Sequence, residues 1–166
     1  MNGNFRPTCK FLWRTLVHKL YVFRAGLRTR APLWRLVVHD WTKFTPAEAP
    51  HYGRRHYGSA DDILGFVYAW NHHSKLNPHH WEFWIPLTAH RLSPVKAGKP
   101  LPMPEWAVRE MVADWLGASR AYEGLWPDTL ESWKWLHGAR PSMKLHDDTQ
   151  KTLDAVLAEY FRKPIR

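Results

Sequence analysis

Apolar side chains recur every three or four residues along most of this chain, and no stretch alternates apolar with polar residues as a half-buried strand does. Such a spacing predicts helices, because it places the apolar residues on one side of each helical turn. The predicted helices cover approximately residues 9–27, 32–40, 59–73, 104–122, 129–137 and 148–161. We therefore expect an all-α fold.

The length of 166 residues is that of one ordinary domain. A chain of this size buries ~70% of the surface that its unfolded form exposes, which is enough for a core. Hydrophobic residues make up 45% and charged residues 23%, a globular balance rather than that of a disordered chain. The expectation is one compact helical domain over residues 1–166, with its core between about residues 9 and 162.

The first predicted helix is amphipathic, and its apolar side should face the core. His18 projects from the opposite side, beside the basic Arg14. The apolar stripe consists of Leu12, Leu16, Leu20, Phe23 and Leu27.

Three segments interrupt the helical pattern. Residues 45–59 are rich in proline, glycine, histidine and tyrosine, and they are predicted to form short helical turns and loop. Asn77–Pro78 breaks the chain before a short helical segment from His79 to about Trp84. Residues 91–104 contain four prolines and are predicted to form an exposed loop.

The net charge of +9 is concentrated at the N-terminal end of the chain. Residues 1–43 contain nine lysines and arginines but a single acidic residue, Asp40. A basic block of this kind indicates an anionic partner, namely a phosphorylated small molecule, nucleic acid or an acidic membrane surface. The alternative is a solvated basic face with no specific partner.

Cysteine content and hydropathy bear on the compartment. Cys9 is the single cysteine, so the chain can form no internal disulfide, and a reducing environment is favoured. No stretch approaches the ~20 apolar residues of a spanning helix, and no apolar signal core precedes a cleavage site. We expect a cytoplasmic protein with no transmembrane segment.

Eleven histidines are several-fold more than a chain of this length usually carries, and neutral imidazole is the commonest protein ligand for metals. Four features form the candidate constellation: His18, the doublet His39-Asp40, the segment HHSKLNPHHWEFW from His72 to Trp84, and Asp114. Adjacent side chains at a helix end diverge by ~100° and can flank one ion. Taken singly, each histidine is more often a surface or core residue than a ligand, and the two His-His pairs could belong to an exposed turn.

Asp114 lies on a helix face of small residues, where another helix or an ion could approach. That face consists of Ala107, Glu110, Asp114, Gly117 and Ala118. Glu110 could then orient a ligand histidine or an arginine. The alternative is a surface salt bridge from Glu110 or Asp114 to Arg109 or Lys144.

Other histidines are set aside. The second doublet, His146-Asp147, precedes a helix that Asp147 or Asp148 would cap. No partner at metal-ligand spacing accompanies His51, His56, His90 or His137. Cys9 has no sequence context that would make it a nucleophile.

The order His18, His39-Asp40, Asp114 resembles the signature of the HD-domain superfamily of metal-dependent phosphohydrolases. The string HDWTK is similar to a form found in its cyclic-dinucleotide phosphodiesterase branch, although the chain lacks that branch's Gly-Tyr-Pro tripeptide. The strings HDWTKF, AWNHHSKLNPHHWEFW and REMVADWLGA resemble an uncharacterised bacterial and phage family, a domain of unknown function.

The resemblance to HD domains implies a helical HD-like fold and a hydrolase of phosphate esters, with a nucleotide or related phosphorylated molecule as substrate. It implies one or two divalent ions per chain, and mixed nitrogen and oxygen ligands suit Mn, Fe, Co, Ni or Zn. The principal metal ligands would be His18, His39, Asp40 and Asp114.

The same resemblance gives roles to further residues. His73, His79 and His80 would bind a second ion or donate protons to the leaving group. Lys43 and Arg14 would offset the charge of the substrate phosphate.

There are two alternatives to a hydrolase. One is a non-catalytic binder of nucleic acid, which would use the basic first helix, and the other is a peripheral membrane protein.

Overall fold

The computed structural model describes residues 5–58, 62–88 and 96–165, and every regular element in these ranges is a helix. The α-helices are α1 (Phe5–Thr29), α2 (Leu33–Val38), α3 (Ala49–Tyr57), α4 (Ile63–Leu76), α5 (Glu105–Ala118), α6 (Lys134–Ala139) and α7 (Asp147–Phe161). Shorter 3₁₀ or π turns are η1 (Trp41–Phe44), η2 (Trp81–Trp84), η3 (Ser119–Glu123) and η4 (Arg140–Ser142). The prediction of an all-α fold is confirmed, since the described ranges contain no strand.

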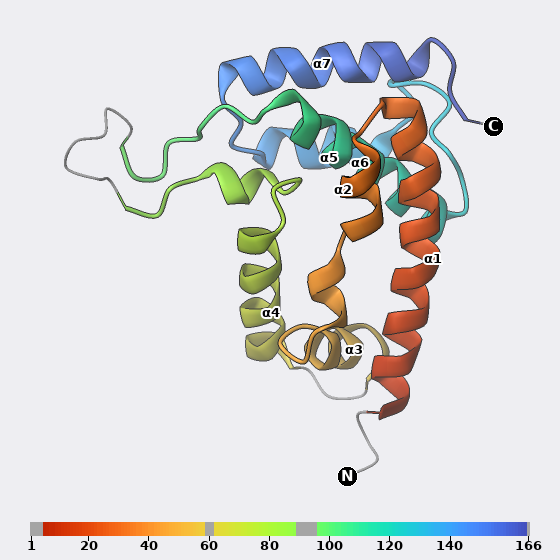
Figure 1. Cartoon of the computed structure of the whole chain (residues 1–166), viewed down its shortest axis with the longest axis vertical. Coiled ribbons are helices and arrows are strands. Elements are labelled where there is room, and N and C mark those ends of the chain that lie inside the picture. The colour runs from red at the N-terminus through yellow and green to blue at the C-terminus, as the bar shows by residue number, and fades with distance from the viewer. Residues whose placement is uncertain (1–4, 59–61, 89–95, 166) are drawn as a thin grey trace.

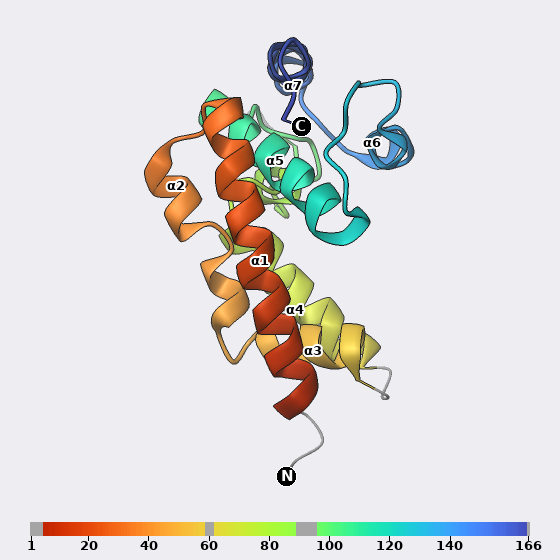
Figure 2. The same ribbon diagram turned by 90° about the vertical axis from the view of Figure 1, so that its right-hand side faces the viewer.

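The helices form a frame around η1. In Figure 1, α1 and α4 stand on either side of the α2–η1 segment, α3 lies below and α7 runs across the top. The packing of η1 against both α1 and α4 agrees with this view. The most extensive contacts in the fold are those of α1 with α5 and with α3, and Figure 2 shows α1 crossing α5. A long N-terminal helix thus holds both ends of the molecule together.

The apolar core lies where α1, α5 and α7 meet. It contains Val22, Met111, Leu116, Leu153 and Leu157, all with almost no exposed surface. At Gly117 the two backbones approach so closely that a Cβ atom would lie 2.6 Å from the side chain of Val22. The face of small residues on α5 therefore receives α1, which brings the middle of α1 against Asp114.

The predicted orientation of α1 is wrong. The predicted stripe points largely outward: Leu20 is 71% exposed and Leu27 54%, whereas His18 is only 3% exposed. Where α1 crosses α5, its inner face instead carries small or polar residues, because the close approach leaves no room for leucine side chains, whereas Phe11 packs against α3. The buried residues of α1 are Phe11, Thr15, His18, Val22, Ala25, Gly26 and Thr29.

Several predicted boundaries also differ. Residues 49–57 form a regular helix, α3, in place of the predicted turns and loop, and Pro50 lies in its first turn, where it needs no N–H partner. The helix predicted from residue 129 begins only at Lys134. His146, rather than Asp147 or Asp148, caps α7 by accepting the Asp148 N–H. Of the predicted loop at 91–104, residues 91–95 lie outside the described residues, and so does His90.

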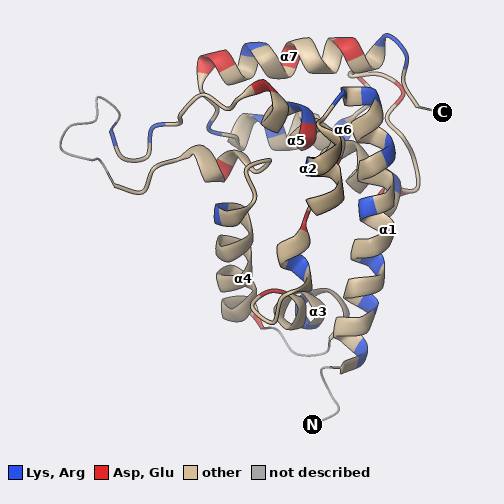
Figure 3. Ribbon diagram, in the orientation of Figure 1, with Lys and Arg blue, Asp and Glu red and all other residues tan. Residues whose placement is uncertain are grey.

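Basic and exposed apolar side chains lie along the outer side of α1. Figure 3 shows lysines and arginines at several levels along this helix. Between them lies the outward apolar stripe, so the outer side of α1 is both basic and apolar. None of the described helices combines the length and apolar character that crossing a bilayer requires.

Candidate metal centre

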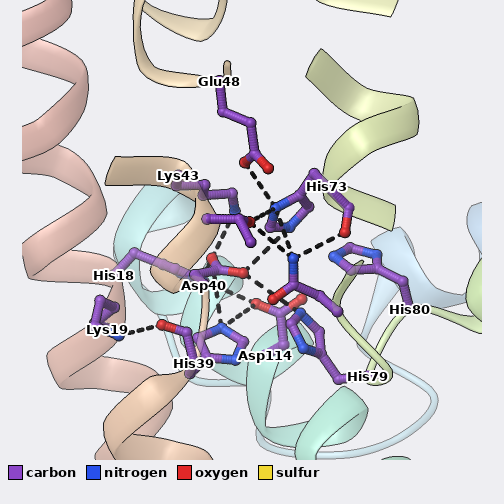
Figure 4. Close-up of polar contacts among 12 residues, drawn as sticks. His18, Lys19, His39, Asp40, Lys43, Glu48, His73, His79, His80 and Asp114 are labelled. Carbon is purple, nitrogen blue, oxygen red and sulfur yellow. Dashed lines mark hydrogen bonds and ion pairs between the residues drawn. The ribbon is translucent and has the colours of Figure 1, made fainter. Parts of the chain in front are cut away.

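Asp40 lies at the middle of a buried polar cluster (Figure 4). It follows α2 in a turn with φ = 56°, immediately before η1. A left-handed backbone is uncommon for residues other than glycine, although aspartate adopts it more readily than most. The Asp40 side chain has no exposed surface, so both carboxylate oxygens face other buried groups.

The first half of the cluster comprises His18, His39 and Asp114 around one oxygen of Asp40. Asp40 Oδ2 lies 3.5 Å from His18 Nε2 and 3.5 Å from His39 Nε2. Asp114 Oδ1 lies 2.9 Å from His18 Nε2 and 3.3 Å from His39 Nε2. These side chains come from α1, from the end of α2, and from α5, which is far from both in the sequence.

The second half comprises His73, His79 and His80 around the other oxygen. Asp40 Oδ1 lies 3.2 Å from His73 Nε2 and 3.5 Å from His79 Nε2. His80 belongs to the same group, in which the candidate ligand atoms all lie within 4.8 Å of one another. His73 lies in the last turn of α4, whereas His79 and His80 lie in the turn before η2.

The spacing in the first half matches that of ligands around one divalent ion. Metal–ligand bonds to imidazole and carboxylate are ~2.0–2.2 Å long, so neighbouring ligands lie ~3.0 Å apart in an octahedron and ~3.4 Å apart in a tetrahedron. The contacts in the first half run from 2.9 to 3.5 Å. Because Asp40 presents one oxygen to each half, its carboxylate could bridge two ions.

The inward-facing atoms of the cluster have unsatisfied hydrogen-bonding capacity. They are buried and make no hydrogen bond to any residue that the structure describes. Leaving a buried polar atom in this state costs ~1–3 kcal/mol, and a metal ion would relieve that cost by taking the lone pairs. The atoms are Asp40 Oδ1 and the Nε2 atoms of His18, His39, His73, His79 and His80.

Glu110, on α5, supports one histidine from each half. Its Oε1 atom lies 3.1 Å from His39 Nδ1 and 3.3 Å from His79 Nδ1. Its other oxygen accepts a hydrogen bond from Arg35 Nε at 2.7 Å. With a proton on Nδ1, the His39 ring directs the lone pair of Nε2 towards Asp40, which is how outer carboxylates commonly orient metal-binding histidines. His79 Nδ1 lies within ion-pair distance of Glu110 but makes no hydrogen bond to it.

Glu48 supports the second half in the same way. Its two oxygens lie 2.9 Å from His73 Nδ1 and 2.7 Å from His72 Nδ1. Asn77 donates to Thr42 Oγ1, which itself lies 3.0 Å from His73 Nδ1. His73 is therefore held by groups from the η1 region, the start of α3 and the end of α4.

Comparison with known families gives one match. A family described as a family of unknown function, DUF5662, matches residues 8–159. The chain belongs to this family. No curated protein and no solved structure matches it. Every residue of both halves of the cluster lies within the range matched to DUF5662, whose description states no activity.

The carboxylates of the DUF5662 domain remain ionised although they are buried. Burial would raise the pKa of Asp40, but His39, Lys43 and His73 outweigh it and hold the pKa well below the usual range. The pKa of Asp114 is lowered in the same way by His18 and His39. Two anionic carboxylates thus face the imidazoles, as a cation-binding site requires.

The pKa values of the cluster histidines shift in different directions, depending on the charged groups around each ring. Burial alone would lower the pKa of His18, but the neighbouring carboxylates of Asp114 and Asp40 outweigh burial and raise it. The pKa values of His39 and His79 are likewise raised, against burial, by the surrounding carboxylates. Burial, with His79 and His73 nearby, instead lowers the pKa of His80 well below its usual value. Metal binding to the first three would therefore displace protons.

Of two further predicted site residues, only Lys43 lies beside the cluster. Lys43 Nζ is 2.6 Å from Asp40 Oδ2, and the neighbouring carboxylates, against the effect of burial, raise the pKa of Lys43 and keep it cationic. Arg14 does not reach the cluster. Its guanidinium donates to the Ala121 carbonyl at 2.5 Å and lies over the ring of Tyr122.

A cavity of about 330 Å³ opens over the cluster. Its lining includes Lys43, four cluster residues (His18, His79, His80 and Asp114) and the tryptophans Trp70, Trp81, Trp115 and Trp135. The polar cluster thus lies at one side of a largely aromatic cavity. That combination is typical of sites for small organic ligands.

The surface salt bridges considered for α5 do not form. Glu110 pairs with Arg35, and Arg109 pairs instead with Glu105 and Glu159. Asp114 pairs with histidines of the cluster. The histidines set aside lie away from it and have other contacts: His51 with Asp62, His56 with Tyr52, and His137 with the Leu130 carbonyl.

Sequence reasoning missed Glu48, Thr42 and Asn77. Glu48 lies between two prolines in a segment without helical period, so no helix face could relate it to His73. Thr42 and Asn77 carry no charge and match no metal-ligand pattern. The one available signal was their position next to Lys43 and His79, which were predicted site residues.

Proposed function

We propose that this domain is a metal-dependent phosphohydrolase that acts on a nucleotide or related phosphate ester. The observation that carries the proposal is the arrangement around Asp40, whose two oxygens each face a separate set of buried imidazoles with free lone pairs. The motif order shared with HD-domain phosphohydrolases supports the same reading. The mixed nitrogen and oxygen ligands suit Mn, Fe, Co, Ni or Zn.

The proposed ligands follow the two halves. His18, His39, Asp40 and Asp114 would hold the principal ion, and His73, His79 and His80 would hold a second ion with the other oxygen of Asp40. A bound divalent ion lowers the pKa of its water and polarises a phosphoryl oxygen. Glu110 and Glu48 would keep the imidazoles in the tautomer that directs Nε2 inward.

Lys43 would bind the substrate phosphate. Its ammonium lies at the edge of the cluster and lines the cavity, so it can meet an anion that approaches Asp40 from solvent. His79 and His80 line the same cavity, where either could transfer a proton to the departing oxygen if it is not coordinated. Arg14, held on Tyr122, would add positive charge farther from the reacting centre.

The proposal is tested by metal analysis of the purified protein together with rates on a panel of nucleotides and phosphodiesters. We expect bound divalent metal and hydrolysis that a chelator abolishes. In Lys43→Ala the metal should remain and kcat should fall ~10²–10³-fold, because a charge contact to the transition state is lost. A metal-free protein without turnover on any added divalent ion would overturn the proposal.

A second candidate function is a non-catalytic binder of nucleic acid, and the basic residues exposed along α1 favour it (Figure 3). Such a binder would show affinity that falls steeply with salt, with a slope of ~0.9 per phosphate contacted. Lys10→Gln and Arg28→Gln should then weaken binding, while Asp40→Asn should retain or improve it. A hydrolase would respond to Asp40→Asn with loss of metal and turnover.

A further inference from the structure

A second cavity adjoins the one over the metal centre. It measures about 300 Å³, close to the 330 Å³ of the first. Two residues, Lys43 and Tyr122, line both cavities. The second cavity is otherwise lined by Phe11, Arg14, Tyr52, His56 and Tyr57.

The two shared residues touch the candidate ligands directly. Lys43 Nζ lies 2.6 Å from Asp40 Oδ2, and the Tyr122 ring stacks on His18 with 6.0 Å between centroids and 20° between planes. The two cavities therefore share a wall, formed by Lys43 and Tyr122, at the edge of the metal centre. A phosphorus atom held there could carry one substituent into each cavity.

Both cavities have aromatic walls. Trp70, Trp81, Trp115 and Trp135 line the first. In the second, the rings of Phe11 and Tyr52 stack at 5.0 Å and 10°, and His56 continues the stack at 17° to Tyr52. Flat aromatic groups such as nucleobases stack on surfaces of this kind with little dependence on their identity.

The second cavity also offers polar contacts. Tyr52 is 4% exposed, and its hydroxyl makes no hydrogen bond to any described residue. Arg14 and Lys43 add positive charge to the same walls. A ligand with an aromatic ring and polar edge atoms could satisfy the hydroxyl, whereas a purely apolar ligand would leave it unpaired.

Size and charge limit what can bind. Ligand pockets span ~300–1,000 Å³, so each cavity is at the small end and suits one ring system with little more. Among the described residues that line the first cavity, Lys43 is the only lysine or arginine. Beyond the proposed metal ions, the lysines and arginines of the first cavity thus offer no second cation for the further phosphates of a polyphosphate, so a single phosphate group at the metal centre suits it better.

From this juxtaposition we infer that the substrate is a phosphodiester with an aromatic group on each side, as in two linked nucleosides. The inference rests on the proposed hydrolase function and adds the substrate class. In the reaction an oxygen of water forms a bond to phosphorus and one phosphorus–oxygen ester bond breaks. The departing oxygen takes a proton, and the products are a phosphomonoester and an alcohol.

The experiment compares bis(4-nitrophenyl) phosphate, which has two aromatic arms, with 4-nitrophenyl phosphate, which has one. With Mn²⁺ added, we expect kcat/KM for the diester to exceed that for the monoester at least ~10-fold, because loss of one stacked ring typically weakens binding ~5–100-fold. Tyr57→Ala, at the exposed rim of the second cavity, should raise KM for the diester alone.

The matched control is Trp135→Ala, at the exposed rim of the first cavity. Since the single arm of the monoester would occupy the cavity over the metal centre, this variant should raise KM for both esters. Calorimetric binding of the diester to chelator-treated protein gives a readout without turnover. Both variants should weaken that binding ~5–100-fold.

The outcomes separate the two claims. If both esters are hydrolysed and Tyr57→Ala changes neither KM, or changes both KM values equally, the two-cavity inference is overturned. The hydrolase proposal then still stands. Diester binding that depends on both rims without any turnover would support the two-cavity site and overturn the proposed function. Neither binding nor turnover would overturn both.

Discussion

The two halves of the candidate metal centre share Asp40 but differ in how many of their other residues lie on helices. The first half takes His18 and Asp114 from the helices α1 and α5, and only His39 from a turn, the one that follows α2. The second takes His73 from the last turn of α4, and its other two histidines from the turn that follows. Side chains on helices are held more rigidly than side chains on turns. The comparison predicts a tighter ion in the first half than in the second.

The largest expected effect comes from the residue that both halves share. Asp40→Asn keeps the size of the side chain but removes its charge, so both halves should lose metal. The loss of affinity should exceed the ~10–100-fold that removal of an outer partner causes. Metal content after equilibrium dialysis measures it, and turnover should be abolished.

The second His-Asp doublet provides a matched control for this variant. Asp147 follows His146 at the start of α7, away from the cluster, and is exposed. Asp147→Asn should leave metal content unchanged. Equal metal content in Asp40→Asn and Asp147→Asn would show that Asp40 is not a ligand.

The next largest effect comes from variants that should each remove metal from only one half of the centre. Asp114→Asn should remove the tighter ion and leave the weaker, whereas His80→Ala should remove the weaker ion and leave the tighter. Titration calorimetry with Mn²⁺ on protein freed of metal resolves the two steps. Loss of both steps in both variants would mean that the two halves bind metal only together.

Removal of metal should destabilise the fold. Without ions, the buried carboxylates and imidazoles of both halves keep unsatisfied atoms. An ion present at 100 times its Kd stabilises the folded state by ~2.7 kcal/mol. For a domain of this size that corresponds to a Tm difference of ~5–11 °C. Thermal unfolding with and without a chelator measures it, and identical Tm values would contradict metal binding.

The sequence predicted much of this arrangement because two of its signals are local. Helical period gave the all-α class, and α4, α5 and α7 lie close to their predicted positions. The motif order predicted His18, His39, Asp40 and Asp114 as site residues, and the histidine-rich segment predicted His73, His79 and His80. Both signals depend on the spacing of residue types along the chain. In a regular helix that spacing decides which residues lie on the same face.

The rest depended on tertiary packing. The amphipathic pattern of α1 pointed the wrong way, because close contact with α5 and the polar cluster leaves space only for small and polar side chains where the two helices cross. Glu48 was missed because it reaches His73 from another element, across a sequence separation that no local pattern encodes. Outer partners of a site are therefore harder to predict than its motif residues.

The smallest predicted effect comes from substitution of Glu110 and Glu48, the carboxylates that contact the histidines of the two halves from outside. Glu110 contacts His39 in the first half and His79 in the second, whereas Glu48 contacts only His73 within the cluster. Glu110→Gln should weaken both ions ~10–100-fold, because an amide holds the imidazole tautomer less firmly than a carboxylate. Glu48→Gln should weaken the second ion alone. Since Glu110 also pairs with Arg35, a fall in Tm without a change in either ion would assign Glu110 a purely structural role.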